Sequence, residues 1–198
     1  MHKEGDALLI QQPVYYPFRE VIEDNGRIFV NNQLHYEDGK YTIDFEDFEK
    51  KIVDNNVKVF ILCNPHNPVG RVWTKEELEK MGDICLKHNV VIMDDEIHCD
   101  FTYPGFKFTS FMTLDKKYHN SLVLYTSPSK TFNVAGLQPA NIIIKNQELR
   151  AAYRKANVAA GYSQGSIMGQ VAVKSVYTKG DEWVNELVEY ITGNMNYM

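Results

Sequence analysis

Residues 57–95, VKVFILCNPHNPVGRVWTKEELEKMGDICLKHNVVIMDD, decide the fold. They begin with a β-branched and apolar run, Val57–Leu62, which predicts a buried strand. Thr74 followed by Glu77 has the pattern of a capping box, which predicts the start of a helix. A second apolar run, Val90–Met93, predicts another strand. A strand, a helix and a strand in this order predict two parallel strands joined by a crossover helix.

The same alternation continues on both sides of this unit. Further strands are predicted at Ala7–Gln12, Arg27–Val30, Leu122–Tyr125 and Asn141–Ile144. Helices are predicted at Phe18–Asp24, Phe45–Asp54, Gln147–Ala159, Ser166–Thr178 and Asp181–Thr192. The polar stretch His35–Lys40 is predicted to be a turn. Continuous apolar strands that alternate with helices predict an α/β fold with a parallel sheet covered on both faces.

The composition excludes several classes of partner. The chain has 198 residues, 44% of them hydrophobic, and a net charge of −5, so it can build a core but offers no broad basic surface to nucleic acid or anionic membranes. No apolar run approaches the ~20 residues of a membrane helix, and residues 1–6 lack a signal-peptide core. Cys63, Cys85 and Cys99 form an odd set without paired spacing. We therefore expect a cytoplasmic protein without disulfides.

Polar clusters follow the predicted strands at the points where they end. In parallel sheets, ligands bind at the carboxyl ends of the strands, so these clusters are candidate site residues. Four of them lie at Gln11–Tyr16, Asn64–Gly70, Asp94–Asp100 and Ser127–Lys130.

Lys130 has two interpretations. It follows the buried strand Leu122–Tyr125 and is surrounded by hydroxyl-bearing residues. Most lysines are exposed, so it could be an ordinary surface residue on a loop. Alternatively, its amine could form a Schiff base with an aldehyde cofactor. The other clusters have to decide between these interpretations.

Two further clusters have a structural and a functional interpretation. The Asn-Pro pairs of Asn64–Gly70 predict a rigid connection, which could also present a fixed amide side chain at the ligand edge. Tyr15 and Tyr16 could be core or surface aromatics. At a ligand edge, one of them could stack on a planar cofactor.

The acidic cluster Asp94–Asp100 has three interpretations. Its carboxylates, histidine and cysteine could bind a metal, and a metal-dependent hydrolase would use Asp94, Asp95, Glu96 and His98. The spacing matches none of the specific zinc or calcium motifs, so we predict no metal site. One carboxylate could instead pair with a cationic ring nitrogen. The remaining interpretation is a solvated strand end.

Taken in order, these stretches resemble one enzyme family. Residues 64–73 (NPHNPVGRVW), 95–98 (DEIH) and 127–133 (SPSKTFN) resemble motifs of the fold-type-I pyridoxal-phosphate (PLP) enzymes of aminotransferase class I/II, and most of all the cystathionine β-lyase-like C–S lyases. The resemblance covers nearly the whole chain. It implies a three-layer α/β/α large domain with a mainly parallel sheet.

The resemblance also implies residue roles. Lys130 would be the catalytic Schiff-base lysine and would move the substrate's α-proton. Asp95 would pair with the protonated pyridine nitrogen and keep the ring an electron sink. Asn67 would donate a hydrogen bond to the phenolic oxygen of the ring.

Four further residues would complete the cofactor site. His98 occupies a position where many aminotransferases have a tyrosine that reaches the same phenolic oxygen, and where the C–S lyase-like proteins often have histidine. Tyr15 would stack on the ring face. Ser127 and Ser129 would lie near the cofactor phosphate.

The chain departs from the family pattern in two respects. Gln138 occupies the position, eight residues after Lys130, at which many aminotransferases place a phosphate-binding arginine; this departure fits the lyase-like subgroup better. The chain is also shorter than family members. We therefore expect residues 1–198 to be a partial, single PLP-binding large domain, without the family's N-terminal segment and small C-terminal domain.

The function expected from this resemblance is a PLP-dependent C–S β-lyase that acts on amino acids. One alternative is a class I/II aminotransferase, because the same residues serve both reactions. Another is a truncated, non-catalytic relative that binds PLP weakly or not at all. The expected partners are a small amino-acid substrate and a second copy of the chain in a homodimer.

Overall fold

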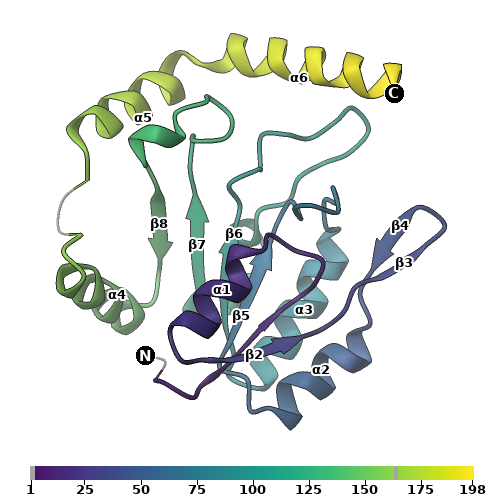
Figure 1. Cartoon of the computed structure of the whole chain (residues 1–198), viewed down its shortest axis with the longest axis vertical. Coiled ribbons are helices and arrows are strands. Elements are labelled where there is room, and N and C mark those ends of the chain that lie inside the picture. The colour runs from purple at the N-terminus through teal and green to yellow at the C-terminus, as the bar shows by residue number, and fades with distance from the viewer. Residues whose placement is uncertain (1–2, 163–164) are drawn as a thin grey trace.

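A mostly parallel sheet forms the centre of the computed structural model, which describes residues 3–162 and 165–198 (Figure 1). Within these residues the sheet has six strands in the order β2-β1-β5-β6-β7-β8. The strands are β1 (Ala7–Ile10), β2 (Ile28–Asn31), β5 (Val59–Cys63), β6 (Val91–Asp95), β7 (Leu122–Thr126) and β8 (Asn141–Ile144). All neighbouring pairs are parallel except β7 and β8. The predicted mainly parallel sheet is confirmed.

Helices cover both faces of the sheet. The helices are α1 (Pro17–Asp24), α2 (Phe45–Asp54), α3 (Lys75–Lys87), α4 (Gln147–Ala159), α5 (Ile167–Lys179) and α6 (Asp181–Tyr197), with short 3-10 turns at η1 (Phe111–Thr113), η2 (Lys116–Ser121) and η3 (Ala135–Leu137). Leu9 of β1 packs with α2 and α3, whereas its neighbour Ile10 packs with Ile22 of α1. Since successive strand residues point to opposite faces, α1 lies opposite α2 and α3, which confirms the three layers.

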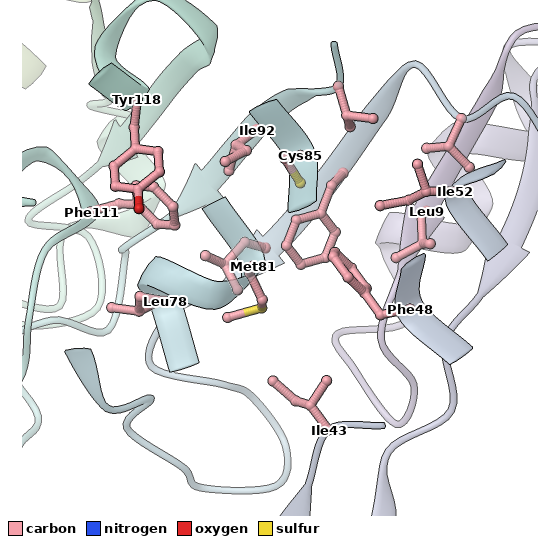
Figure 2. Close-up of a cluster of buried hydrophobic side chains, with 14 of the residues drawn as sticks. Leu9, Ile43, Phe48, Ile52, Leu78, Met81, Cys85, Ile92, Phe111 and Tyr118 are labelled. Atoms are coloured by element: carbon pink, nitrogen blue, oxygen red, sulfur yellow. The ribbon is translucent and has the colours of Figure 1, made fainter. Parts of the chain in front are cut away.

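The larger core lies between the sheet and helices α2 and α3. Figure 2 shows Phe48, Met81 and Cys85 gathered against strand residues such as Ile92. The Phe48 ring meets the Phe60 ring of β5 edge to face, with 5.0 Å between the centroids. The capping box predicted from Thr74 is present at the start of α3. This core fixes the strands whose carboxyl ends carry the candidate site.

The segment predicted as a turn at His35–Lys40 differs in the structure. It forms an antiparallel hairpin of β3 (His35–Glu37) and β4 (Lys40–Thr42), which is separate from the main sheet. Asp38 and Gly39 connect the strands with φ values of 48° and 78°. An Asp-Gly turn of this kind is a strong hairpin signal. Only the two central residues turn, and the residues on either side of them pair as strands.

Helices α5 and α6 follow the main sheet and lie along the edge where β7 ends (Figure 1). Their surfaces carry exposed apolar side chains, including Ile167, Met168, Trp183 and Tyr190. In the part of the chain that the structure describes, no helix is long and apolar enough to cross a membrane.

Candidate functional site

The candidate site is formed by the loops that follow β1, β5, β6 and β7. These strands are direct neighbours and parallel, so their carboxyl ends meet at one edge of the sheet. The register pairs Cys63 of β5 with Asp95 of β6, and Asp95 with Tyr125 of β7. The predicted site residues that follow each strand are therefore brought to one edge.

Lys130, Asp95 and His98 form the electrostatic centre of this edge. Lys130 is exposed in the loop after β7. Burial, and then the charge of Lys130, lower the pKa of the His98 imidazole. Burial raises the pKa of the Asp95 carboxyl, while the Ile97 N–H and the Lys130 charge act against that rise. Lys130 is thus close enough to influence both side chains, although they come from a different strand end.

Asp95 has capacity to accept a cationic donor. Its Oδ1 accepts one hydrogen bond, from the Ile97 N–H at 3.2 Å. No ion pair involves Asp95 among residues 3–162 and 165–198. A half-buried carboxylate with one hydrogen bond and no ion pair favours a positively charged partner. A protonated ring nitrogen is a group of that kind.

Asn67 is held by its own loop. The Asn67 N–H donates to Cys63 Sγ at 3.4 Å. Asn67 and His98 line a cavity of about 850 Å³ together with aromatic residues of the β3–β4 hairpin and of the loop at 101–106. Lys130, Asp95 and Tyr15 do not line it. The structure therefore brings Asn67 and His98 to one cavity, which adjoins the Lys130–Asp95 centre.

Tyr15 lies in the loop after β1, and the residue is 42% exposed. The ring meets the Phe18 ring edge to face, with 5.8 Å between the centroids. Its loop is tied to the loop of Asn67, because His66 Nε2–H donates to the Pro13 carbonyl at 3.0 Å. The loops that carry Tyr15 and Asn67 are therefore held together by a single buried histidine.

His66 should make the fold sensitive to acid. Burial lowers its pKa from 6.5 to about 4. Because the unfolded chain binds a proton that the folded chain excludes, this group stabilises the fold above pH 6.5 and loses that contribution as the pH falls to about 4, by up to about 3 kcal/mol. Urea unfolding of wild type and His66→Gln between pH 4 and 7 measures it. The variant should show a shallower fall, and equal slopes would contradict the prediction.

Ser127 and Ser129 bond to each other and to a neighbouring carbonyl. Their hydroxyl oxygens lie 2.7 Å apart, and Ser127 Oγ lies 2.5 Å from the carbonyl oxygen of Pro139. The Ser129 N–H donates to Ser127 Oγ at 3.1 Å. Both side chains are buried. The two serines thus lie side by side directly before Lys130, and Pro139 is their present acceptor.

Two contacts that hold the Lys130 loop were not predicted. The Thr131 hydroxyl donates to Asp100 Oδ2 at 2.7 Å, and Trp183 Nε1–H donates to the Thr131 carbonyl at 3.1 Å. The partners are 31 and 52 residues away in the sequence, so no local pattern could reveal them. They fix the loop of Lys130 to the β6 loop and to α6.

Removing the Thr131 hydroxyl should loosen this loop. Thr131→Val loses a charge-assisted hydrogen bond to an exposed carboxylate, so the free energy of unfolding should fall by about 1 kcal/mol. Urea unfolding measures the change. Asp100→Asn is the matched control, because it keeps an acceptor oxygen, and it should change stability less. Equal stability of Thr131→Val and wild type would refute the assigned contact.

The acidic cluster after β6 divides between the two faces of the sheet. Asp94 and Glu96 are buried on the face opposite Asp95. No group of three or more His, Cys, Asp or Glu side chains that could hold a metal ion is found within the described ranges.

Comparison with known proteins identifies relatives along the whole chain. The family model described as aminotransferase class I and II matches residues 1–198. The cystathionine β-lyase PatB of Bacillus subtilis is 44% identical over 97% of this chain and 50% of its own length. The chain spans about half the length of the curated relatives it matches.

Solved structures show the same fold. Cystalysin from Treponema denticola, whose crystal structure contains a pyridoxal 5′-phosphate cofactor, superposes with a TM-score of 0.96 at 39% identity, over 98% of this chain and 50% of that one. The PLP-bound C–S lyase from Staphylococcus hominis gives a TM-score of 0.91 at 35% identity, over 99% of this chain and 49% of that one.

Proposed function

Because this chain belongs to the aminotransferase class I and II family, we propose that residues 1–198 form the PLP-binding domain of an enzyme that cleaves C–S bonds in amino acids. The observation that carries this proposal is that Lys130, Asp95 and His98 lie together at the carboxyl ends of the parallel strands. The lyase relatives favour C–S cleavage over transamination.

The chemistry of the donor set fits this cofactor. Asp95, a half-buried carboxylate without an ion-pair partner in the described chain, would accept the N–H of the protonated pyridine ring. The exposed amine of Lys130 would attack the cofactor aldehyde. Asn67 and His98 would donate hydrogen bonds to the phenolic oxygen from the side of their shared cavity.

The remaining predicted residues fit the other parts of the cofactor. Tyr15 would cover one ring face, since its ring is partly exposed at the end of β1. Ser127 and Ser129 would bind the phosphate with their adjacent hydroxyls in exchange for the Pro139 carbonyl. Gln138 provides no positive charge, so these hydroxyls would contribute more to phosphate binding than in relatives with an arginine at that position.

The proposed mechanism assigns the proton movements to Lys130. When bound, the cofactor supplies an electron sink next to the substrate's Cα–H bond. Lys130 Nζ removes the Cα proton, and Asp95 keeps the ring nitrogen protonated. In the lyase reaction the Cβ–S bond then breaks and the sulfur leaves as a thiolate. In the transaminase reaction Lys130 would hold the same proton and give it back, and no Cβ–S bond would break.

A product assay separates the two reactions. The protein is incubated with PLP and cystathionine, and thiol and ammonia are measured. A lyase releases both without a keto-acid acceptor. Consumption of an added keto acid without thiol release would instead identify the transaminase and overturn the proposed C–S cleavage.

The proposed setting is a cytoplasmic homodimer that binds an amino-acid substrate, with neither nucleic acid nor a membrane as partner. The cysteines of the described chain are free, as is usual in a reducing compartment. The exposed apolar side chains of α5 and α6 are suited to a subunit contact. Light scattering in solution tests the dimer, and a monomer at all concentrations would exclude it.

A further inference from the structure

Two carboxylic acids are buried behind the candidate site. Asp94 is 0% exposed and Glu96 is 2% exposed. They flank Asp95 in the sequence. The alternation of β6 turns Asp94 towards the face covered by α3, away from Asp95, and Glu96, directly after the strand, contacts Asp94. Neither acid has a role in the proposed mechanism, although burying a charge is costly without a partner.

The hydrogen bonds around the two acids are incomplete. Glu96 Oε1 accepts from the Phe111 N–H at 2.9 Å, and Asn64 Nδ2 donates to the Thr109 carbonyl at 3.1 Å. Both oxygens of Asp94 and the Oδ1 of Asn64 lack a donor among the described side chains and backbone. No lysine, arginine or histidine in the described chain forms an ion pair with either acid.

One proton bound by the two acids would remove one negative charge and supply the missing hydrogen-bond donor. The titratable groups that influence Asp94 are Glu96, with which it is in hydrogen-bonding contact, and Asp95; its own charge also acts on the Cys63 thiol. Glu96 and Asp95 are carboxylic acids, so each disfavours a negative charge on Asp94. Burial and the neighbouring Glu96 carboxylate raise the pKa of Asp94 well above its ordinary value. A protonated Asp94 can donate its O–H to Glu96, which remains the acceptor for Phe111.

We propose that Asp94 is a positioning residue that shares one proton with Glu96, and that this acid pair fastens the end of β6 to the segment at residues 109–111. Glu96 holds the Phe111 N–H at one end of the segment, and Asn64, beside Asp94, holds the Thr109 carbonyl at the other. The loop at 101–106, which precedes this segment, lines the cavity with His98. The proton thus keeps the strand end that presents Asp95 and His98 in place.

Infrared spectroscopy tests the shared proton directly and needs no cofactor. Wild type at pH 7 should show the C=O stretch of a buried, protonated carboxylic acid. Asp94→Asn should lose this band, and the control Asp24→Asn, at an exposed carboxylate, should keep it. If Asp94→Asn does not fold, Glu96→Gln replaces it, because the introduced amide can donate to an ionised Asp94 and the band should again disappear. A wild-type spectrum without the band would overturn the proposal.

The pH dependence of stability gives a second readout. Folding takes up the proton on Asp94, so this group's contribution is complete below pH 3.8 and is lost as the pH rises through the higher folded-state pKa. Asp94→Asn should remove this loss, so its stability relative to wild type should rise as the pH increases above 3.8. Equal slopes would contradict the proposal. A wild-type stability that rises with added Na⁺ or Mg²⁺ at constant ionic strength would also contradict the proposal, because it would indicate a cation between the acids.

The effect on the site rests on the proposed function and is tested separately. Asp94→Leu, which cannot donate to Glu96, should weaken PLP binding roughly fivefold, the value of one lost hydrogen bond. Asp94→Asn keeps a donor and should stay within roughly twofold of wild type. Equal affinities of the leucine variant and wild type would refute the positioning role. Absence of PLP binding in wild type would refute the proposed function. The infrared and stability results would still test whether Asp94 and Glu96 share a proton.

Discussion

Replacing Lys130 with alanine is expected to abolish the Schiff-base absorbance that appears when PLP is added to the wild-type protein. The reason is that this amine lies at the carboxyl ends of the strands, close enough for its charge to act on Asp95 and His98. Catalysis should fall by at least about 10²- to 10⁴-fold, the usual contribution of a positioned acid–base group, because the Cα proton loses its acceptor.

Two controls make the Lys130 result specific. Lys130→Arg keeps the positive charge next to Asp95 and His98 but cannot form a Schiff base with the cofactor, so it should also lack the absorbance. Lys107→Ala removes an exposed loop lysine and should leave the absorbance unchanged. An unchanged absorbance in Lys130→Ala would show that another amine holds the cofactor.

Replacing Asp95 with asparagine should weaken PLP binding about 10- to 100-fold. A hydrogen bond to a charged group is worth about 1.5–3 kcal/mol, and each 1.4 kcal/mol is a factor of ten in affinity. Asparagine keeps the shape of Asp95 but removes the charge that stabilises a protonated ring nitrogen. Fluorescence or absorbance titration with PLP measures the change.

The control for Asp95 is a carboxylate of the same type outside the site. Asp24→Asn changes the net charge by the same amount at an exposed position and should bind PLP like wild type. If Asp95→Asn also binds like wild type, the carboxylate does not contact the ring nitrogen and the assigned orientation of the cofactor is wrong.

The strands and main helices could be predicted because their signals are local. Val59–Cys63 and Val90–Met93 are short apolar runs, and the capping box at Thr74 marks the start of a helix within four residues. The parallel arrangement then follows from the alternation of elements. The same logic placed Asn67, Asp95 and Lys130 at one edge of the sheet.

The β3–β4 hairpin differs from the predicted turn, although its signals are local. Its residues are mostly polar and exposed, so no apolar alternation marks two strands there. What stabilises the pairing is the contact of the Tyr36 and Tyr41 rings, with 4.8 Å between their centroids, across an Asp-Gly turn. Both features lie within a short stretch of chain and could have been read from the sequence.

The contacts that support the site could not be predicted, because their partners are far apart in the chain. Thr131 meets Asp100 and Trp183 only after β6, β7 and α6 have come together. Likewise, without the family resemblance the sequence presents Asp94 and Asp95 as two adjacent acids. Only the pleat of β6 shows that one is buried towards α3 and the other lies at the ligand edge.

The central claim, that Lys130 is the attachment point for PLP, is tested most directly by reductive trapping. The protein is incubated with PLP, reduced with borohydride, digested and analysed by mass spectrometry. We predict that the cofactor mass is found on the peptide that contains Lys130, at close to one equivalent per chain. Labelling spread over exposed lysines such as Lys107 and Lys116, or absent from Lys130, would contradict the proposed site.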